Sequence, residues 1–202
     1  MTSGRDRLRD GPPPPSVLAL GSATQDRLRR FLGLVQRWNQ ATNLVSGRCT
    51  AHHLWRLVDE SLQAAPYLPE GVRVLDVGSG AGIPAIPLLV ARSDITGVLL
   101  EVRERRWAFL REAVRELELP ADARRQRLED VGDEKFGAVT VRGVERSMWQ
   151  RGAARVLASG GVVIWWTAAR RAREADLPGR VLVCPMLGAE QGAMLVWNPC
   201  FT

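Results

Sequence analysis

Hydrophobic positions follow two different periods along this chain. In the first third, apolar residues recur every three or four positions, as on one face of a helix. Thr24 is a suitable N-cap for the first of these segments, and Pro66 and Pro69 end the second. The pattern predicts two amphipathic helices, with apolar positions at Leu28, Phe31, Leu32, Val35 and Trp38, and at Leu54, Leu57, Val58, Leu62 and Ala65.

From Gly71 onward, short apolar runs alternate with longer segments of helical period. Strands joined in this way by helices form a parallel sheet that is covered on both faces. The predicted strands are 72–77, 96–101, a short one within 123–128, 136–141 and 160–166, and the predicted helices are 84–92, 103–119 and 145–157. Two last runs, 180–186 and 192–198, predict an antiparallel hairpin at the C-terminal edge, so the expected fold class is α/β.

Composition divides the chain further. Residues 1–15 are charged and then proline-rich, and they predict a disordered arm. Residues 16–70 predict a helical cap that forms one globular unit with residues 71–202. The chain has no apolar run of membrane-spanning length and no apolar stretch after its basic start. We therefore expect a cytoplasmic protein without a membrane partner, and we expect a monomer.

The charge balance is basic, with a net charge of +6 and a sequence pI near 10.4. Such a balance favours a polyanionic partner, because neutralised phosphates release counterions. The alternative is that genome base composition favours arginine codons, since Lys135 is the only lysine among 28 basic residues. Three cysteines, Cys49, Cys184 and Cys200, are far apart and odd in number, so they predict thiols and neither a disulfide framework nor a metal site.

The stretch VLDVGSGAGIP, residues 74–84, places glycines at alternate positions after an acid. A glycine loop between a strand and a helix lets the backbone approach a ligand and directs helix N–H groups toward it. Dinucleotide folds space these glycines as G-x-G-x-x-G. The spacing D-x-G-x-G-x-G is typical of methyltransferases that use S-adenosylmethionine, whereas a plain tight turn is the simplest alternative. Its members here are Asp76, Gly78, Gly80 and Gly82.

An acid ends the second predicted strand. Glu101 stands where a carboxylate can take both ribose hydroxyls of a cofactor in a bidentate pair. The loop and the acid in register favour a Rossmann-like S-adenosylmethionine-dependent methyltransferase fold for residues 71–202, ahead of a nicotinamide-binding fold.

Further motifs resemble the glucose-inhibited division B family (GidB, or RsmG), and the likeness covers most of the chain from about residue 24. The motifs are Pro84 and Pro87 in the loop, Trp38-Asn39, Asn43-Leu44, APYL at 65–68, RRWAFLREAVRELEL at 105–119, QRLED at 126–130 and VRG at 141–143. The resemblance implies an enzyme that methylates N7 of a guanine in small-subunit (16S) ribosomal RNA. It also implies S-adenosylmethionine as cofactor and the RNA or the 30S subunit as partner.

The loop pattern and the resemblance together give a set of cofactor-binding residues. The loop and the acid after the second strand give Asp76, Gly78, Gly80, Gly82 and Glu101, and the resemblance implies Ile83, Leu128, Glu129 and Arg142 as further contacts. On the substrate side the resemblance implies Arg142 at the mouth of the site. The spacing of the arginines predicts Arg146 on a basic helical flank with Arg142, Arg151 and Arg155, and we expect Trp166 as a platform for the base. The alternative for Glu129 and the arginines is ordinary surface charge.

The chain departs from the family on the substrate side. WWTA at 165–168 lacks the lysine of the family's Leu-Lys-Gly, and LVDES has Leu57 and Glu60 where the family has histidine and aspartate. Guanine N7 carries a free lone pair, so its methylation needs alignment and no general base, and we expect no catalytic residue. Two alternatives stay open. One is a methyltransferase for another RNA base or a small molecule, and the other is a non-catalytic RNA- or ribosome-binding module.

Overall fold

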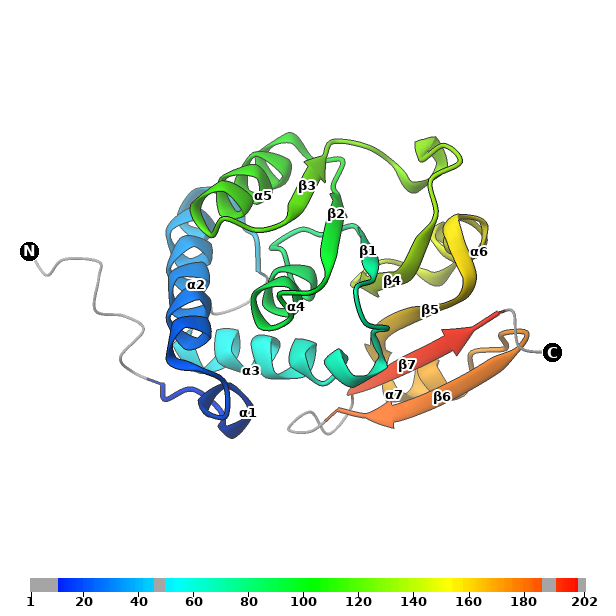
Figure 1. The fold of residues 1–202 in the computed structure, drawn as a ribbon, viewed down its shortest axis with the longest axis horizontal. Helices are drawn as coiled ribbons and strands as arrows, with labels where there is room; N and C mark the ends of the chain where they lie inside the picture. Colours follow the sequence, from blue (N-terminus) through cyan, green and yellow to red (C-terminus); the bar gives the residue numbers. More distant parts are fainter. Residues whose placement is uncertain (1–10, 46–49, 187–191, 200–202) are drawn as a thin grey trace, which may run out of the picture.

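In the part of the chain that the structure describes, seven strands form one sheet at the centre of the fold (Figure 1). The computed structural model describes residues 11–45, 50–186 and 192–199, so most of the expected N-terminal arm, together with Cys49 and Cys200, lies outside the described residues. The strand order is β3-β2-β1-β4-β5-β7-β6. The strands are β1 (Arg73–Val77), β2 (Thr96–Leu100), β3 (Ala121–Arg124), β4 (Phe136–Arg142), β5 (Leu157–Ala168), β6 (Arg180–Pro185) and β7 (Gly192–Asn198).

The pairing of these strands confirms the predicted fold class. Strands β1 to β5 pair in parallel, whereas β7 runs antiparallel to both β5 and β6. Two apolar clusters lie on opposite faces of the sheet, and neighbouring residues of β5 contribute to different ones. Trp166 belongs to the cluster shared with the N-terminal helices, while Trp165 belongs to the other. This alternation follows from the two-residue period of a strand.

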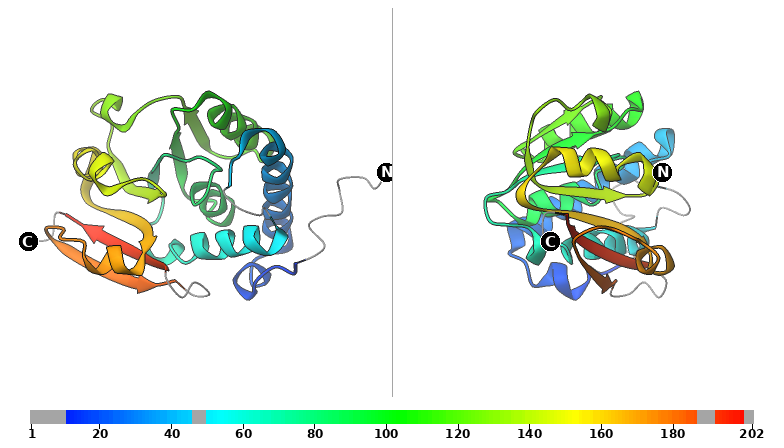
Figure 2. Two further views of the ribbon diagram at one scale, coloured as in Figure 1. Left: turned by 180° about the vertical axis from the view of Figure 1, so that it is seen from behind. Right: turned by 90° about the vertical axis from the view of Figure 1, so that its right-hand side faces the viewer.

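Helices cover both faces of the sheet (Figures 1 and 2). The helices are α1 (Pro15–Leu18), α2 (Ser22–Thr42), α3 (Ala51–Leu62), α4 (Ala85–Ala91), α5 (Glu104–Glu116), α6 (Gln150–Val156) and α7 (Ala169–Arg173). Residues of α2, α3, α4 and α5 share one apolar cluster with the sheet, and residues of α6 and α7 share the other. In the described part of the chain, no helix has the length and apolar character to cross a membrane.

Several boundaries differ from the predicted ones. Helix α2 begins at Ser22 with Gly21 as its N-cap, so Thr24 lies inside the helix. Strand β3 begins before the expected segment, because its place is set by pairing with 97–100 of β2. The following residues, Leu128–Asp130, form a 3-10 turn. The predicted helix at 145–157 is divided into a short turn and α6, and the short helices α1 and α7 were not predicted.

Helices α2 and α5 pack side by side in opposite directions. The guanidinium groups of Arg27 and Arg30 donate to Leu117 O at 2.7 Å and Glu116 O at 2.6 Å, at the carboxyl end of α5. The last carbonyls of a helix lack intrahelical partners and attract cations, so both arginines stabilise this end. Farther along α2, the Trp38 ring meets Phe109 edge-on, with centroids 5.9 Å apart.

Candidate functional site

The glycine loop begins at Gly78, where β1 ends at the carboxyl edge of the sheet. Ser79 N–H donates to Leu100 O at 2.8 Å, which ties the loop to the end of β2. Gly78, Gly80 and Gly82 have φ values of +71°, +53° and +74°. Residues with a Cβ are strained in this left-handed region, so the alternate glycines are needed by the backbone itself.

Gly82 has a second constraint that allows a stability test. A Cβ added there would lie 2.4 Å from Ile86 Cδ1 in the packed core, whereas a Cβ on Gly71, at φ +63°, would meet nothing. We expect G82A to lower the free energy of unfolding by about 1–3 kcal/mol more than G71A, because both share the backbone strain and only Gly82 adds overpacking. Urea denaturation of both variants measures the difference. Equal losses of unfolding free energy would contradict the prediction and show that the Ile86 side chain moves aside without cost.

Asp76 lies beneath the loop and is 1% exposed. Its Oδ1 accepts a hydrogen bond from Thr140 Oγ1 at 2.7 Å, across the β1–β4 pair. Its Oδ2 is buried without a hydrogen-bond partner among the described residues. Burial raises the pKa of the Asp76 carboxyl to about 6, against the opposing effect of the Thr140 hydrogen bond. The folded protein therefore holds this proton more tightly than the unfolded chain does.

This difference in proton affinity predicts a pH dependence of stability. The ordinary pKa of the carboxyl is 3.8, so its stabilising contribution is fully present below about pH 4 and is lost as the pH rises through about 6. We expect the free energy of unfolding of the wild type to fall by about 2–3 kcal/mol relative to D76N between pH 4 and pH 7. Denaturation of both proteins across this range tests it, and a constant difference between them would contradict it.

Glu101 is the acid at the end of β2, and it is held by main-chain donors on both oxygens. Gly80 N–H donates to Oε2 at 3.1 Å, and Arg103 N–H donates to Oε1 at 2.8 Å. The carboxylate is buried and lies directly beside the loop. An ionised carboxylate has about four acceptor positions, so each oxygen retains one for a further donor.

Arg142, at the end of β4, forms an ion pair with Glu60 of α3. Glu60 is 1% exposed, and Arg56 supplies a second, more distant cation at 3.7 Å. Arg142 Nη1 is buried and has no hydrogen-bond partner among the described residues. The Val144 side chain lies 2.6 Å from where a Cβ on Gly78 would stand. The end of β4 and the glycine loop are therefore neighbours.

The remaining residues predicted for the cofactor lie around this edge. Ile83 and Leu128 are buried, in the two different apolar clusters, and the Glu129 side chain is exposed. The main chain of the 128–129 turn is fixed by Arg155, whose Nη2 donates to Leu128 O at 3.1 Å and Glu129 O at 3.4 Å.

Two predictions for the substrate side need correction. Trp166 is 3% exposed, and its indole N–H donates to Glu60 O at 2.9 Å, so its ring is part of the core and offers no face to a base. Residues of α2 and α3 belong to the same apolar cluster as Trp166. Arg146 does not stand on a helical flank with Arg151 and Arg155, because it lies in a separate 3-10 turn and donates to Asp176 O at 3.0 Å.

The sequence interpretation missed Thr140, and it named Glu60 only as a departure from the family. Thr140 is a polar residue inside the apolar strand FGAVTV, and Glu60 is an acid on the apolar face of α3. A polar residue at a core position is rarely buried without a partner, so each was a detectable signal. The sequence does not show which residue pairs with each of them. Thr140 pairs with Asp76, and Glu60 pairs with Arg142.

The strand order, the glycine loop after β1 and the acid after β2 define the class of Rossmann-like methyltransferases. A SAM dependent methyltransferase from Aquifex aeolicus has a similar fold, with a TM-score of 0.57 and 15% identity over 82% of this chain and 96% of that one. Residues 24–181 match the profile of GidB, described as rRNA small subunit methyltransferase G. The chain belongs to this family.

Curated relatives agree with this assignment. The ribosomal RNA small subunit methyltransferase G of Neisseria gonorrhoeae is 35% identical over 81% of this chain and 78% of its own length. The protein of the same name from Chromobacterium violaceum is 40% identical over 52% of this chain. The chain spans only 50% of the length of that relative and 61% of two others.

Proposed function

We propose that this protein transfers a methyl group from S-adenosylmethionine to N7 of a guanine in small-subunit ribosomal RNA. We place it in the cytoplasm, as a monomer that acts on the 16S RNA or the 30S subunit. The observation that carries the proposal is Glu101, whose two oxygens are fixed by Gly80 and Arg103 beside the glycine loop. Family membership and the names of the relatives support the RNA substrate.

The residues present fit the proposed cofactor. The free acceptor position on each Glu101 oxygen matches a pair of ribose hydroxyls. The buried, unpartnered Nη1 of Arg142 matches a carboxylate at the amino-acid end. A Cβ on Gly80 would meet no atom closer than 3.7 Å, so this glycine leaves room for the ligand beside the main chain. The 128–129 turn would flank the adenine.

The proposed reaction requires the protein to align the cofactor with guanine N7. S-adenosylmethionine, when bound, supplies an electrophilic methyl group on a sulfonium centre. Guanine N7 is already a nucleophile, so no side chain has to remove a proton. Glu101 and the loop would hold the cofactor end of the site, and Arg142, which Glu60 keeps in place, would hold a negative charge at its mouth. Buried apolar residues, among them Ile83 and Leu128, would exclude water from the site.

A methyl-transfer assay tests the proposal. The full chain is incubated with labelled S-adenosylmethionine and either isolated 30S subunits or deproteinised 16S RNA, and modified guanines are located by cleavage at N7-methylguanine. Label at one guanine N7 is the expected result. Label on another RNA base or on a small molecule would replace the substrate, and cofactor binding without transfer would favour the non-catalytic module.

A further inference from the structure

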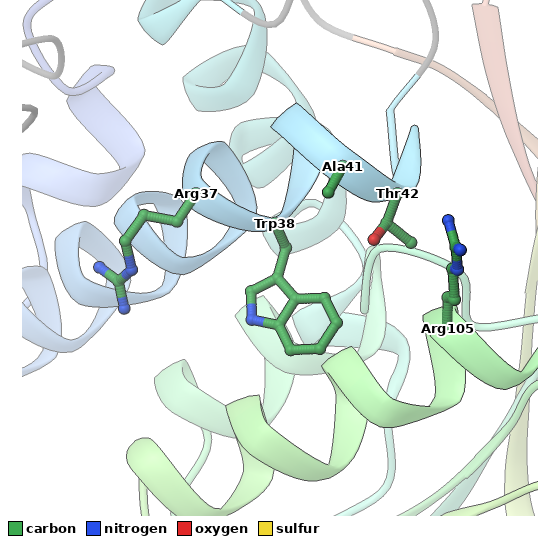
Figure 3. Close-up of a pocket in the computed structure, with 5 residues that line it drawn as sticks. All are labelled: Arg37, Trp38, Ala41, Thr42 and Arg105. Atoms are coloured by element: carbon green, nitrogen blue, oxygen red, sulfur yellow. The ribbon is translucent and has the colours of Figure 1, made fainter.

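A groove separates the carboxyl-terminal half of α2 from the start of α5 (Figure 3). One part of it, of about 510 Å³, is lined by Arg37, Trp38, Ala41, Thr42 and Arg105. A second part, of about 390 Å³, shares Thr42 and Arg105 with the first and adds Asn43, Arg103, Glu104 and Arg106. Because the two parts share residues, we treat them as one feature, the α2–α5 groove.

The groove is basic, with four arginines and a single glutamate along its walls. Arg37, Arg103 and Arg105 are exposed, and none of their guanidinium groups forms a hydrogen bond or ion pair with another residue of the described ranges. Most other arginines described here donate to a carboxylate or a carbonyl; Arg106, for example, donates to Asn43 O at 3.0 Å. Three unpaired guanidinium groups on one groove repel each other, and a chain of phosphates would relieve this repulsion.

The middle of the groove is aromatic. The Trp38 ring, half-buried against Phe109, lies between the positions of Arg37 and Arg105 (Figure 3). Surfaces that bind single-stranded nucleic acid combine arginines that contact the backbone with aromatic rings on which bases stack. The lining of the α2–α5 groove therefore matches a single-stranded or loop segment of RNA.

The groove also reaches the cofactor loop. Arg103 is two residues from Glu101, and its main-chain N–H donates to that carboxylate at 2.8 Å. Arg106 Nη1 lies 3.7 Å from where a side chain on Gly80 would begin. A strand in the groove would thus arrive beside the loop at which methyl transfer is proposed.

We propose that the α2–α5 groove binds phosphates of the ribosomal RNA strand that leads to the target guanine. Arg37 and Arg105 contact the backbone, and Trp38 lies under a base between them. The identity of the RNA rests on the proposed function, whereas the groove's binding of an RNA strand rests on its own residues.

The test removes two of the unpaired arginines. We expect R37Q/R105Q to bind deproteinised 16S RNA at least about tenfold more weakly than the wild type in low salt. Across a potassium chloride series, the slope of log affinity against log salt should become shallower by about 1.4–1.8, as expected for two lost phosphate contacts. Filter binding measures both quantities on the full chain.

The matched control is R173Q/R180Q, which removes the same charge from exposed positions outside the groove. Like Arg37 and Arg105, these arginines form no side-chain hydrogen bond or ion pair with another of the described residues. The control should keep the wild-type slope, and both double variants should keep the wild-type affinity for S-adenosylmethionine in calorimetry. An unchanged slope for R37Q/R105Q, equal losses in both variants, or no salt-dependent binding by the wild type would overturn the groove proposal. Binding through the groove without methyl transfer to RNA would overturn the proposed function alone.

Discussion

Replacing Glu101 by alanine is expected to weaken the binding of S-adenosylmethionine by about 100-fold or more. The carboxylate is the proposed acceptor for two ribose hydroxyls, and hydrogen bonds to a charged group contribute about 1.5–3 kcal/mol each. A loss of about 3 kcal/mol corresponds to a factor of about 100 in the dissociation constant. Calorimetric titration of the folded variant measures the change.

A matched control is available in the first turn of α5. Glu104 is on the same segment, but its side chain is 70% exposed and its nearest cation is Arg125 at 3.4 Å. E104A should bind the cofactor as the wild type does. If E101A also binds within about threefold of the wild type, Glu101 is not the ribose acceptor.

The ion pair between Arg142 and Glu60 has the largest expected effect on stability. Removing one member of a buried pair costs about 3–5 kcal/mol, because the remaining charge is left in the core without its partner. R142M would leave Glu60 with Arg56 alone, at 3.7 Å, and we expect it to lower the free energy of unfolding by about 3 kcal/mol or more. Urea denaturation is the measurement.

A double-mutant cycle separates this coupling from simple loss of packing. Apolar replacement of both partners of a buried ion pair is often close to neutral. The loss of unfolding free energy in R142M/E60L should therefore be much smaller than the sum of the losses in R142M and E60L. The exposed pair Arg170–Glu174, with side chains 83% and 59% exposed, provides the comparison. R170M should cost less than about 1 kcal/mol. Additive losses in the R142M/E60L cycle would rule out the coupling.

The sequence predicted the architecture well because its signals were local. Alternating apolar runs and helical segments placed six of the seven strands, and the spacing of Gly78, Gly80 and Gly82 placed the loop. The exception, β3, contains the sequence ADAR, which has no run of large apolar side chains. Its position depends on pairing with β2, and hydrophobic periodicity does not encode that partner.

The substrate side was less predictable because it depends on contacts between distant segments. Periodicity shows that Trp165 and Trp166 point to opposite faces, but it does not show that residues of α2 and α3 pack in the same apolar cluster as Trp166. Glu60 was visible only as a change from the family's aspartate, and its partner Arg142 is 82 residues away. The unpaired arginines at 37, 103 and 105 come together only when α2 and α5 are packed.

The two arginines that cap the carboxyl end of α5 bear on how the groove would bind. Arg27 and Arg30 hold α2 against that end, and the contact of Trp38 with Phe109 fixes the two helices farther along. The walls of the α2–α5 groove are thus positioned by folding, before any RNA is present. Preorganised surfaces lose little conformational entropy on association. In such an encounter the cost of ordering would fall mainly on the flexible RNA strand and on the arginine side chains that contact it.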